Sequence, residues 1–280
     1  MNIETKVRET ISKYKLFSKK DKIVVALSGG KDSTSVIYIL HNLGYNVNGL
    51  FIDLHLGDWS EKNLENVRKF CEELKVPLHV FDMKKEMGSG ICFIKDVVRE
   101  NKGMTGCSVC GILKRWILNK TAREMGGTKL VTGHNLDDEA QTVLMNFLKG
   151  NVELGFNSGP KTGIDRKGFI QRVKPLFFVP ENEIREYSKK MKFPVLYERC
   201  PCAFGTYRVE TRAWLDKISD EEKLRVVNGW MKIISKMKPR KNNGINVCKN
   251  CGAPCRGVVC KACEVLSCIR VGEYSTPLKK

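Results

Sequence analysis

Between Lys22 and Leu148, the sequence alternates short apolar runs rich in β-branched residues with longer segments of helical spacing. The first run, Lys22–Leu27 (KIVVAL), precedes a glycine turn and a predicted helix at 31–43. Further strands are predicted at 47–54, 78–83 and 129–133. Such alternation predicts an α/β fold with a doubly wound parallel sheet, covered by helices on both faces.

The same periodicity predicts helices elsewhere, at residues 1–20, 61–74, 107–125, 136–148, 181–191, 206–218 and 220–237. Residues 88–106 and 150–168 are glycine-rich with little periodicity, so we expect flexible loops there. Residues 194–198 are expected to form a strand or loop, and 239–244 a linker. The predicted organisation is an N-terminal helix (1–20), a central α/β domain (21–238) and a small cysteine-rich module (245–280).

The chain carries a formal net charge of +18 and a sequence pI near 9.4. This excess favours a polyanionic partner, and nucleic acid comes first for a soluble protein. A merely basic, solvated surface is the alternative. No segment resembles a signal peptide or reaches the length of a membrane span, so we expect a cytoplasmic protein that does not bind membranes.

The twelve cysteines include four close pairs. In a reducing compartment such pairs indicate metal or redox chemistry rather than disulfides. Cys71 and Cys92 stand alone, and we expect both to be buried structural thiols. The pairs are Cys107/Cys110, Cys200/Cys202, Cys248/Cys251 and Cys260/Cys263.

The turn after the first strand reads Ser28-Gly29-Gly30-Lys31-Asp32-Ser33. Its glycines allow a tight turn, and the free N–H groups of the following helix suit phosphate oxygens. Hydroxyl groups and the Lys31 ammonium add further donors. The spacing is neither that of a Walker A loop nor that of the dinucleotide fingerprint. Right-handed crossovers bring Ser28, Asp53 and Gly133 to one edge of the sheet, where ligands bind in such folds.

This hexapeptide resembles the PP-loop of the N-type ATP pyrophosphatases, a superfamily with a HUP-like fold. The resemblance implies cleavage of ATP between its α and β phosphates and adenylation of a substrate oxygen. The segment Thr132-Gly133-His134-Asn135-Leu136-Asp137-Asp138 resembles the superfamily's second ATP motif, with Gly133 near the adenine or ribose and Asp137 or Asp138 near Mg²⁺. The implied ATP and Mg²⁺ site comprises Ala26, Ser28, Gly29, Gly30, Lys31, Asp32, Ser33, Asp53, Lys114, Gly133, Asp137 and Asp138.

Cys107 and Cys110 lie at the start of a predicted helix, where positions i and i+3 share a face and the helix dipole stabilises thiolates. A third cysteine decides their chemistry. Three cysteines on a 4Fe–4S cluster leave one iron open to a reactant, by the same logic as an open catalytic zinc. Structural zinc, a dithiol pair and a persulfide carried by Cys110 or Cys200 are the alternatives.

Residues 22–215 resemble the TtcA/TtuA-type tRNA 2-thiolation enzymes in four features. These are Cys107-x-x-Cys110-Gly111, the basic pair Lys114-Arg115, the TGHNLDDEAQTVLMN segment and a late Cys before Tyr207-Arg208. The resemblance implies a 4Fe–4S cluster on Cys107, Cys110 and Cys200, with Cys202 as the alternative third ligand. Lys114 stands where the family usually has Arg and lacks the bidentate fork of a guanidinium.

The C-terminal pattern Cys248-x2-Cys251-x8-Cys260-x2-Cys263 predicts a zinc ribbon, because a small module with few apolar groups needs a metal to hold it together. Cys255 and Cys268 fall outside this spacing. TtuA-type members carry such a ribbon at this place and usually another near the N-terminus, which residues 1–280 do not contain. We therefore expect a protein closer to the TtuA side, with the target base open.

The predicted function is an ATP-dependent tRNA sulfurtransferase that adenylates the C2 oxygen of a pyrimidine, most simply uridine, and replaces it with sulfur. Lys31 and Asp32 would serve the phosphates and the metal, and Cys107, Cys110 and Cys200 the sulfur. The sulfur donor is sulfide or a sulfur-carrier protein, and the resemblance implies a homodimer. Another PP-loop ligase and a non-catalytic zinc-ribbon RNA-binding protein are the rival functions.

Overall fold

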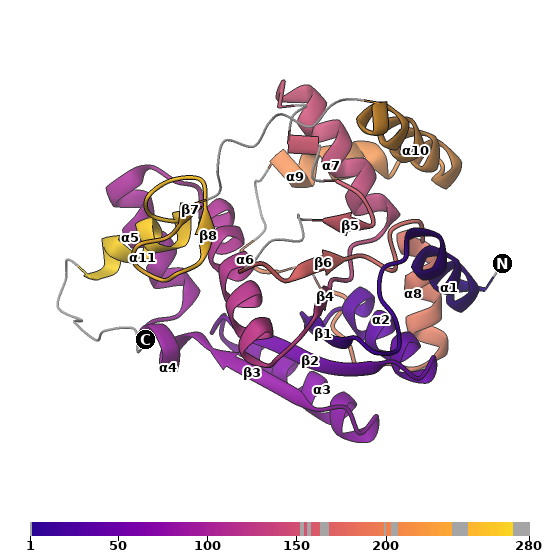
Figure 1. The fold of residues 1–280 in the computed structure, drawn as a ribbon, viewed down its shortest axis with the longest axis horizontal. Coiled ribbons are helices and arrows are strands. Elements are labelled where there is room, and N and C mark those ends of the chain that lie inside the picture. The colour runs from indigo at the N-terminus through magenta and orange to yellow at the C-terminus, as the bar shows by residue number, and fades with distance from the viewer. Residues whose placement is uncertain are drawn as a thin grey trace.

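The computed structural model describes residues 2–151, 154–155, 158–162, 168–198, 200–202, 207–236 and 246–270. Its centre is a six-stranded sheet of order β3-β2-β1-β4-β6-β5, in which only the edge strand β5 is antiparallel (Figure 1). A separate antiparallel pair, β7 and β8, belongs to the C-terminal module. The strands are β1 Lys22–Leu27, β2 Asn46–Asp53, β3 Leu78–Asp82, β4 Lys129–Val131, β5 Lys161–Thr162, β6 Gln171–Val173, β7 Asn246–Val247 and β8 Pro254–Cys255.

Helices cover both faces of this sheet, as the strand–helix alternation predicts. The predicted helices at 31–43 and 136–148 are confirmed within one residue at each end. The helices are α1 Ile3–Tyr14, α2 Lys31–Asn42, α3 Asp58–Glu73, α4 Met83–Met87, α5 Ile91–Lys102, α6 Gly106–Glu124, α7 Leu136–Leu148, α8 Glu181–Lys190, α9 Tyr207–Leu215, α10 Asp220–Lys236 and α11 Lys261–Arg270.

Strand β1 shows how the sequence divides the core between the two faces. Ile23, Val25 and Leu27 belong to a cluster with α1, α2, α3 and α8, whereas Val24 belongs to a cluster with α5, α6 and α11. Alternate side chains of a strand point to opposite faces, so a continuous apolar run fills both layers. A third, smaller cluster joins α7 to α9 and α10, and it includes Phe177.

The glycine-rich segment 88–106 is not the mobile loop that its composition suggested. Residues Ile91–Lys102 form α5, in which Ile91, Ile94 and Val98 are buried on one face. The glycines stand at the helix ends, and Gly103 closes α5 in the left-handed conformation with φ 61°. They terminate helices rather than prevent them.

Two other differences concern single elements. Helix α1 ends at Tyr14 instead of residue 20, because Lys15 adopts the left-handed conformation and caps it. Strands β5 and β6 were not predicted, since two or three residues carry too little periodicity. Residues 194–198, expected as a strand or loop, form a loop. The expected linker at 239–244 lies outside the described residues, as does most of the loop expected at 150–168.

The C-terminal module packs on the main domain through α11, which lies beside α5 and α6 (Figure 1). Lys102 Nζ in α5 donates to the carbonyl oxygen of Glu264 at 2.9 Å. Cys248, Cys260 and Cys263 are buried in the same cluster as Ile94 and Val109. The module therefore shares one hydrophobic core with the sheet domain.

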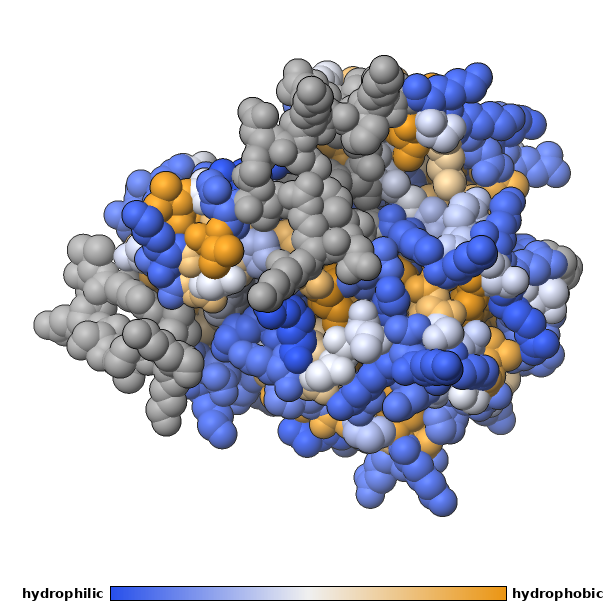
Figure 2. Space-filling view, in the orientation of Figure 1, coloured by the Kyte–Doolittle hydropathy of each residue, from blue (hydrophilic) through white to orange (hydrophobic). Residues whose placement is uncertain are grey.

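Hydrophilic side chains cover most of the face seen in Figure 2, with small hydrophobic areas between them. In the part of the chain that the structure describes, no helix has both the length and the apolar character needed to cross a bilayer.

Candidate functional site

The loop Ser28–Ser33 lies between the carboxyl end of β1 and the first turn of α2, as predicted. Its two serines hold it closed: Ser28 N donates to Ser33 Oγ at 3.1 Å, and Ser33 Oγ donates to the carbonyl oxygen of Gly30 at 3.1 Å. Gly30 precedes α2 without a side-chain cap. The amino end of α2 is therefore free of any side-chain acceptor and suits an anion.

Two glycines of the site are required by close contacts. Gly29 has φ 78°, and a Cβ there would overlap with the side chain of Asn63 in α3. A Cβ on Gly133 would lie 2.8 Å from Ser33 N and 2.9 Å from Asp32 C. The segment after β4 thus presses directly on the phosphate loop, which explains why the second motif needs glycine at this position.

Asp53 lies at the carboxyl end of β2, next to the loop strand, and is buried. Its carboxylate accepts a hydrogen bond from the backbone N–H of His55 at 2.9 Å. Ala26 lies in β1 opposite Leu50 of β2. Both residues are at the expected edge of the sheet, and their roles in ATP binding stay predictions.

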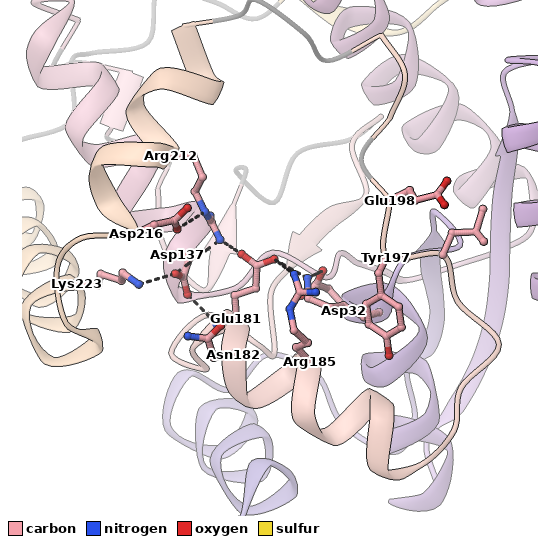
Figure 3. A pocket seen from close by; sticks show the side chains of 13 residues that line it. Asp32, Asp137, Glu181, Asn182, Arg185, Tyr197, Glu198, Arg212, Asp216 and Lys223 are labelled. Carbon is pink, nitrogen blue, oxygen red and sulfur yellow. Dashed lines mark hydrogen bonds and ion pairs between the residues drawn. The ribbon is translucent and has the colours of Figure 1, made fainter.

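A pocket of about 410 Å³ opens directly in front of the loop. Its walls come from the loop and α2, the start of α7 and α8, the segment before Glu198, α9 and α10 (Figure 3). The lining is strongly charged, with cations and carboxylates in nearly equal number. The charged lining residues are Lys31, Arg185, Arg212 and Lys223 against Asp32, Asp137, Glu181, Glu198 and Asp216.

Lys31 is held in this pocket by two carboxylates. Its Nζ lies 2.9 Å from Asp32 Oδ2 and 2.7 Å from Glu181 Oε1. Asn135 Nδ2 donates to the other oxygen of Asp32 at 3.0 Å, so the second ATP motif orients the first. The predicted pair Lys31 and Asp32 is therefore brought together at the pocket floor.

Asp137 and Asp138, which sequence reasoning treated as alternatives, have different surroundings. Asp137 lines the pocket and accepts from Lys223 Nζ at 2.9 Å and from Glu181 N at 2.7 Å. Asp138 caps α7 in a reciprocal pair with Asn135. Burial opposes its ionisation, but His134 and Arg208 beside it lower its pKa overall. Asp137 is the one placed to meet a ligand in the pocket.

The cysteines far apart in the sequence come together beside the start of α6. Burial raises the pKa of the Cys110 thiol, and the nearby Cys200 and Cys107 raise it further. Cys107 Sγ lies 3.7 Å from the carbonyl oxygen of Cys202, so the 200–202 segment rests against the amino end of α6. The thiols of Cys107, Cys110 and Cys200 are thus close enough to interact electrostatically, and their service as ligands of a shared 4Fe–4S cluster stays a prediction.

Cys202 faces a different neighbour. Its thiol interacts with Cys92 and with Lys95, both in the first turns of α5. The stem of Lys95 lies along Gly106, where a Cβ would be 3.2 Å from Lys95 Cδ. Cys92 is exposed, so the expectation of a buried structural thiol was wrong for it, whereas Cys71 is buried as expected. The difference arises because Cys92 lies on the exposed side of the first turn of α5, a helix that the sequence did not predict.

Lys114 and Arg115 lie one turn after the Cys107/Cys110 pair in α6. The positive charge of Lys114 opposes the burial that raises the pKa of Cys110. The Arg115 guanidinium folds back over Gly111, where a Cβ would lie 3.3 Å from Arg115 Nη1. Both cations therefore lie near the Cys107/Cys110 end of α6 in this structure. Lys114 is not among the residues that line the described pocket, and its ATP contact stays a prediction.

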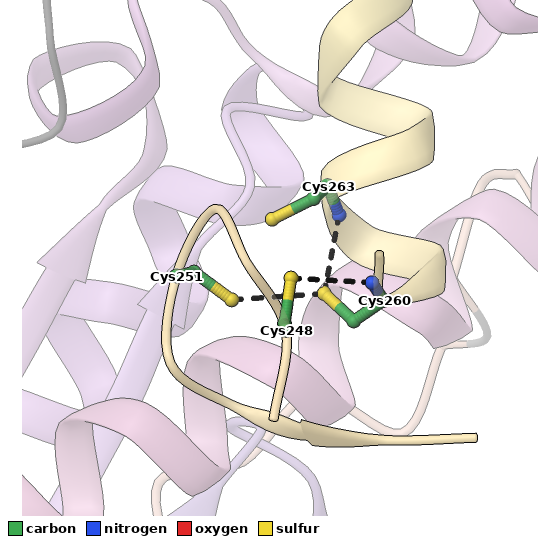
Figure 4. Close-up of side chains that lie close together, drawn as sticks. All are labelled: Cys248, Cys251, Cys260 and Cys263. Carbon is green, nitrogen blue, oxygen red and sulfur yellow. Dashed lines mark hydrogen bonds between the residues drawn. The ribbon is translucent and has the colours of Figure 1, made fainter. Parts of the chain in front are cut away.

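The second group of cysteines has the geometry of a tetrahedral metal site. The sulfurs of Cys248, Cys251, Cys260 and Cys263 all lie within 4.8 Å of one another and point to a common centre (Figure 4). Cys251 Sγ is 3.7 Å from Cys260 Sγ. Two sulfurs that each lie about 2.3 Å from a tetrahedral zinc ion are about 3.8 Å apart, so the four residues fit zinc.

A family model described as "PP-loop domain" matches residues 1–196 of this chain. The chain belongs to the PP-loop family. A relative from Pyrococcus horikoshii, a tRNA-5-methyluridine(54) 2-sulfurtransferase, is 37% identical over 93% of this chain and 83% of its own length. The cytoplasmic tRNA 2-thiolation protein 1 of Caenorhabditis elegans is 30% identical over the whole chain and 76% of its own length. These matches place the chain among the tRNA 2-thiolation enzymes of the PP-loop family.

A solved structure shares the fold of this PP-loop protein over nearly its whole length. The U34-tRNA thiolase NcsA from Methanococcus maripaludis, determined with its [4Fe-4S] cluster, matches with a TM-score of 0.80 and 26% identity, covering 99% of this chain and 89% of that one. The expected fold class and the resemblance to tRNA 2-thiolation enzymes are thereby confirmed.

The pocket also contains residues that the sequence did not reveal. Glu181, Arg212 and Lys223 lie 150 or more positions after Lys31 of the phosphate loop, on three different helices. The only available signal was the acidic first turn of the helix at 181–191, which has an equally good explanation in the helix dipole. Tertiary packing alone selects these three residues.

Proposed function

We propose that this PP-loop protein uses ATP to activate the C2 oxygen of a tRNA uridine and replaces it with sulfur delivered at Cys107, Cys110 and Cys200. The observation that carries the proposal is the gathering of these thiols on a PP-loop scaffold. Residues separated by some ninety positions meet beside α6, and Cys200 acts electrostatically on Cys110. An ATP-binding domain that only ligates or senses nucleotides has no need of this arrangement.

Uridine is supported by the names of the relatives. The Pyrococcus horikoshii protein is named for 5-methyluridine 54, and the Methanococcus maripaludis thiolase for uridine 34. The two names agree on the base and differ in its position. We therefore propose uridine and leave the position to experiment.

In the proposed reaction, ATP lies in the charged pocket with its phosphates at the amino end of α2. The N–H groups there and the Ser28 and Ser33 hydroxyls donate to phosphate oxygens, and Lys31 supplies charge. Asp32, oriented by Asn135, and Asp137 would hold Mg²⁺ against the phosphates. Attack of the base oxygen on the α-phosphate releases pyrophosphate, and AMP then becomes the leaving group when sulfur attacks C2.

The thiolates of Cys107, Cys110 and Cys200 would hold a 4Fe–4S cluster, which supplies an iron without a protein ligand as a place for hydrosulfide. The M. maripaludis thiolase carries such a cluster. The chain's own contribution is to keep a cation near these thiolates, since the charge of Lys114 favours the ionised form of Cys110.

We also infer a structural zinc ion on Cys248, Cys251, Cys260 and Cys263, because their four sulfurs lie within 4.8 Å of one another. The basic net charge of +18 supports tRNA as the partner. A cytoplasmic location is inferred from the name of the C. elegans relative. Homodimer formation and the choice between sulfide and a sulfur-carrier protein stay predictions.

The test is tRNA thiolation by anaerobically reconstituted protein with ATP and sulfide, comparing the wild type with Cys107→Ala. We expect about four irons and four sulfides per wild-type chain, and loss of thiolation in the variant with tRNA affinity intact. Thiolation by iron-free protein under the same conditions would instead show that the cluster is dispensable and that hydrosulfide attacks C2 directly, whereas a persulfide route would require a persulfide donor in place of sulfide. Zinc alone, with neither iron nor thiolation in the wild type, would leave a non-catalytic RNA-binding protein.

A further inference from the structure

Glu181, the first residue of α8, bridges two largely buried cations of the pocket, Lys31 and Arg212, with its two carboxylate oxygens. Oε1 lies 2.7 Å from Lys31 Nζ, and Oε2 forms an ion pair with Arg212. Figure 3 shows Glu181 and Arg212 pointing toward one another, with Asp137 beside them. One side chain thus joins the phosphate loop to α9.

Both cations are largely shielded from water. The side chains of Lys31 and Arg212 are only 10% and 12% exposed, whereas that of Glu181 is 25% exposed. A buried cation without a partner is costly, so each needs an anion in every state of the protein. Without a ligand, Glu181 supplies an anion to both, in addition to Asp32 beside Lys31 and Asp216 beside Arg212.

Arg212 is held in place by more than Glu181. Its Nη2 lies 3.6 Å from Asp137 Oδ1, and its Nε lies 3.3 Å from Asp216 Oδ1, directly after the last residue of α9. These contacts keep the guanidinium on the pocket wall when Glu181 moves away. Arg208, one turn earlier in α9, instead donates to Asp138 at 3.1 Å and does not line the pocket. The helix therefore presents one arginine to the pocket and one outside it.

A phosphoryl group offers the same arrangement as the Glu181 carboxylate, with separate oxygens for a lysine and for an arginine. Arginine binds phosphate through its planar fork, and lysine binds it as a point charge. We propose that Arg212 is a phosphate-binding residue of this pocket and that Glu181 occupies the place of a phosphate until a polyphosphate displaces it. The proposal deepens the proposed function, on which it rests for the identity of ATP as the polyphosphate.

The proposal makes opposite predictions for its two residues. In Arg212→Met, the affinity for ATP should fall by about 10- to 100-fold, since a charge-assisted hydrogen bond to phosphate is lost. In Glu181→Gln, the affinity should rise, by about threefold or more, because the competing anion becomes neutral while its size and its backbone contact to Asp137 are kept. A variant that gains affinity is not explained by damage to the fold.

Affinities are measured by titration calorimetry of the full chain with two probes, MgATP and pyrophosphate without added Mg²⁺. The second probe isolates the contact with Lys31 and Arg212 from any contribution of the metal. Arg208→Gln, on the same helix, is the matched control and should bind both probes like the wild type. Arg212→Lys keeps the charge but not the fork, so it should fall between the wild type and Arg212→Met even if the methionine variant folds poorly.

The outcomes separate this proposal from the proposed function. If the wild type binds neither probe, the ATP-dependent function fails and the proposal with it. Wild-type binding of MgATP with unchanged affinity in both Arg212 variants would overturn the proposal alone. So would a Glu181→Gln variant that binds pyrophosphate no better than the wild type. A loss in the Arg212 variants together with a gain in Glu181→Gln would support it.

Discussion

Cys200 and Cys202 are two positions apart in one short segment, yet their thiols meet different partners. Cys200 acts on Cys110, whereas Cys202 interacts with Cys92 and Lys95 of α5. Alternate residues of an extended chain lie on the same side, but this segment turns at 201–202 and separates them. The motif spacing favours Cys200 on resemblance, the electrostatic interaction of Cys200 with Cys110 agrees with it, and the choice between Cys200 and Cys202 stays a prediction.

From this arrangement we predict that Cys200→Ser loses the cluster and Cys202→Ser keeps it. Iron and sulfide, measured after anaerobic reconstitution, should fall from about four of each per chain to near zero in the first variant and stay near four in the second. Cys92→Ser serves as a further control and should also retain iron. Normal iron content in Cys200→Ser with loss in Cys202→Ser would assign the third ligand to Cys202.

At the scale of single residues, the two local motifs predicted the residues that form the phosphate loop and the segment packed against it. Gly29, Lys31 and Asp32 follow from the hexapeptide, and Gly133 from the second motif. Glu181 and Arg212 could not be predicted, because an ion pair between distant helices leaves no pattern in either segment. Cys92 was misjudged since its exposure depends on a helix whose glycine-rich flanks concealed it.

Among the elements, helix α5 shows how glycines change meaning with position. At a helix end with positive φ, glycine avoids the strain that a Cβ would bring. In a helix interior it only weakens the helix, because its unfolded state has more freedom to lose. Gly103 and Gly229 represent the two cases, and a Cβ at either would meet nothing within 4 Å. A methyl group therefore has room at both positions, and the two sites differ only in their backbone conformation.

Gly229→Ala, within α10, is predicted to raise the free energy of unfolding by about 0.5–1 kcal/mol. Gly103→Ala, at the end of α5 with φ 61°, is predicted to lower it by about 1 kcal/mol. Urea unfolding followed by circular dichroism measures both changes. Equal effects of the same sign would show that helix position does not decide the cost at these sites.

The sequence also predicted the parallel sheet because a run such as strand β1 fills two layers. In β1, Ile23, Val24 and Val25 are β-branched and buried, and Leu27 is also buried. The short strands β5 and β6 escaped prediction, as they are defined by pairing with β4 and with each other rather than by their own residues. The sequence therefore predicts strands whose own residues form a buried apolar run, and it misses short strands that are defined by pairing with a neighbouring strand.

Considered as a whole molecule, the protein is not a sheet domain with a separate ribbon. The ribbon cysteines Cys248, Cys260 and Cys263 belong to the same buried cluster as α5 and α6. Helix α6 also carries Cys107 and Cys110 at its start. A loss of order in the ribbon would expose the outer face of the two helices that surround the thiol centre. Loss of metal from the ribbon should therefore disturb the positions of Cys107 and Cys110, because both groups of cysteines pack against the same helices.

We therefore predict that Cys260→Ser loses zinc and, as a consequence, retains less iron after anaerobic reconstitution. A tetrahedral site with three thiolates and a hydroxyl binds zinc poorly, and a module this small needs its metal to stay folded. Zinc and iron content and the thermal unfolding temperature are measured together, and all three should fall.

The matched control is Cys255→Ser, because the thiol of Cys255 lies outside the tetrahedral group and donates to the carbonyl oxygen of Gly257 at 3.0 Å. Serine preserves that hydrogen bond, so zinc, iron and unfolding temperature should match the wild type. A zinc-free Cys260→Ser protein with wild-type iron content would contradict the coupling. In that case the ribbon would touch α5 and α6 without supporting them.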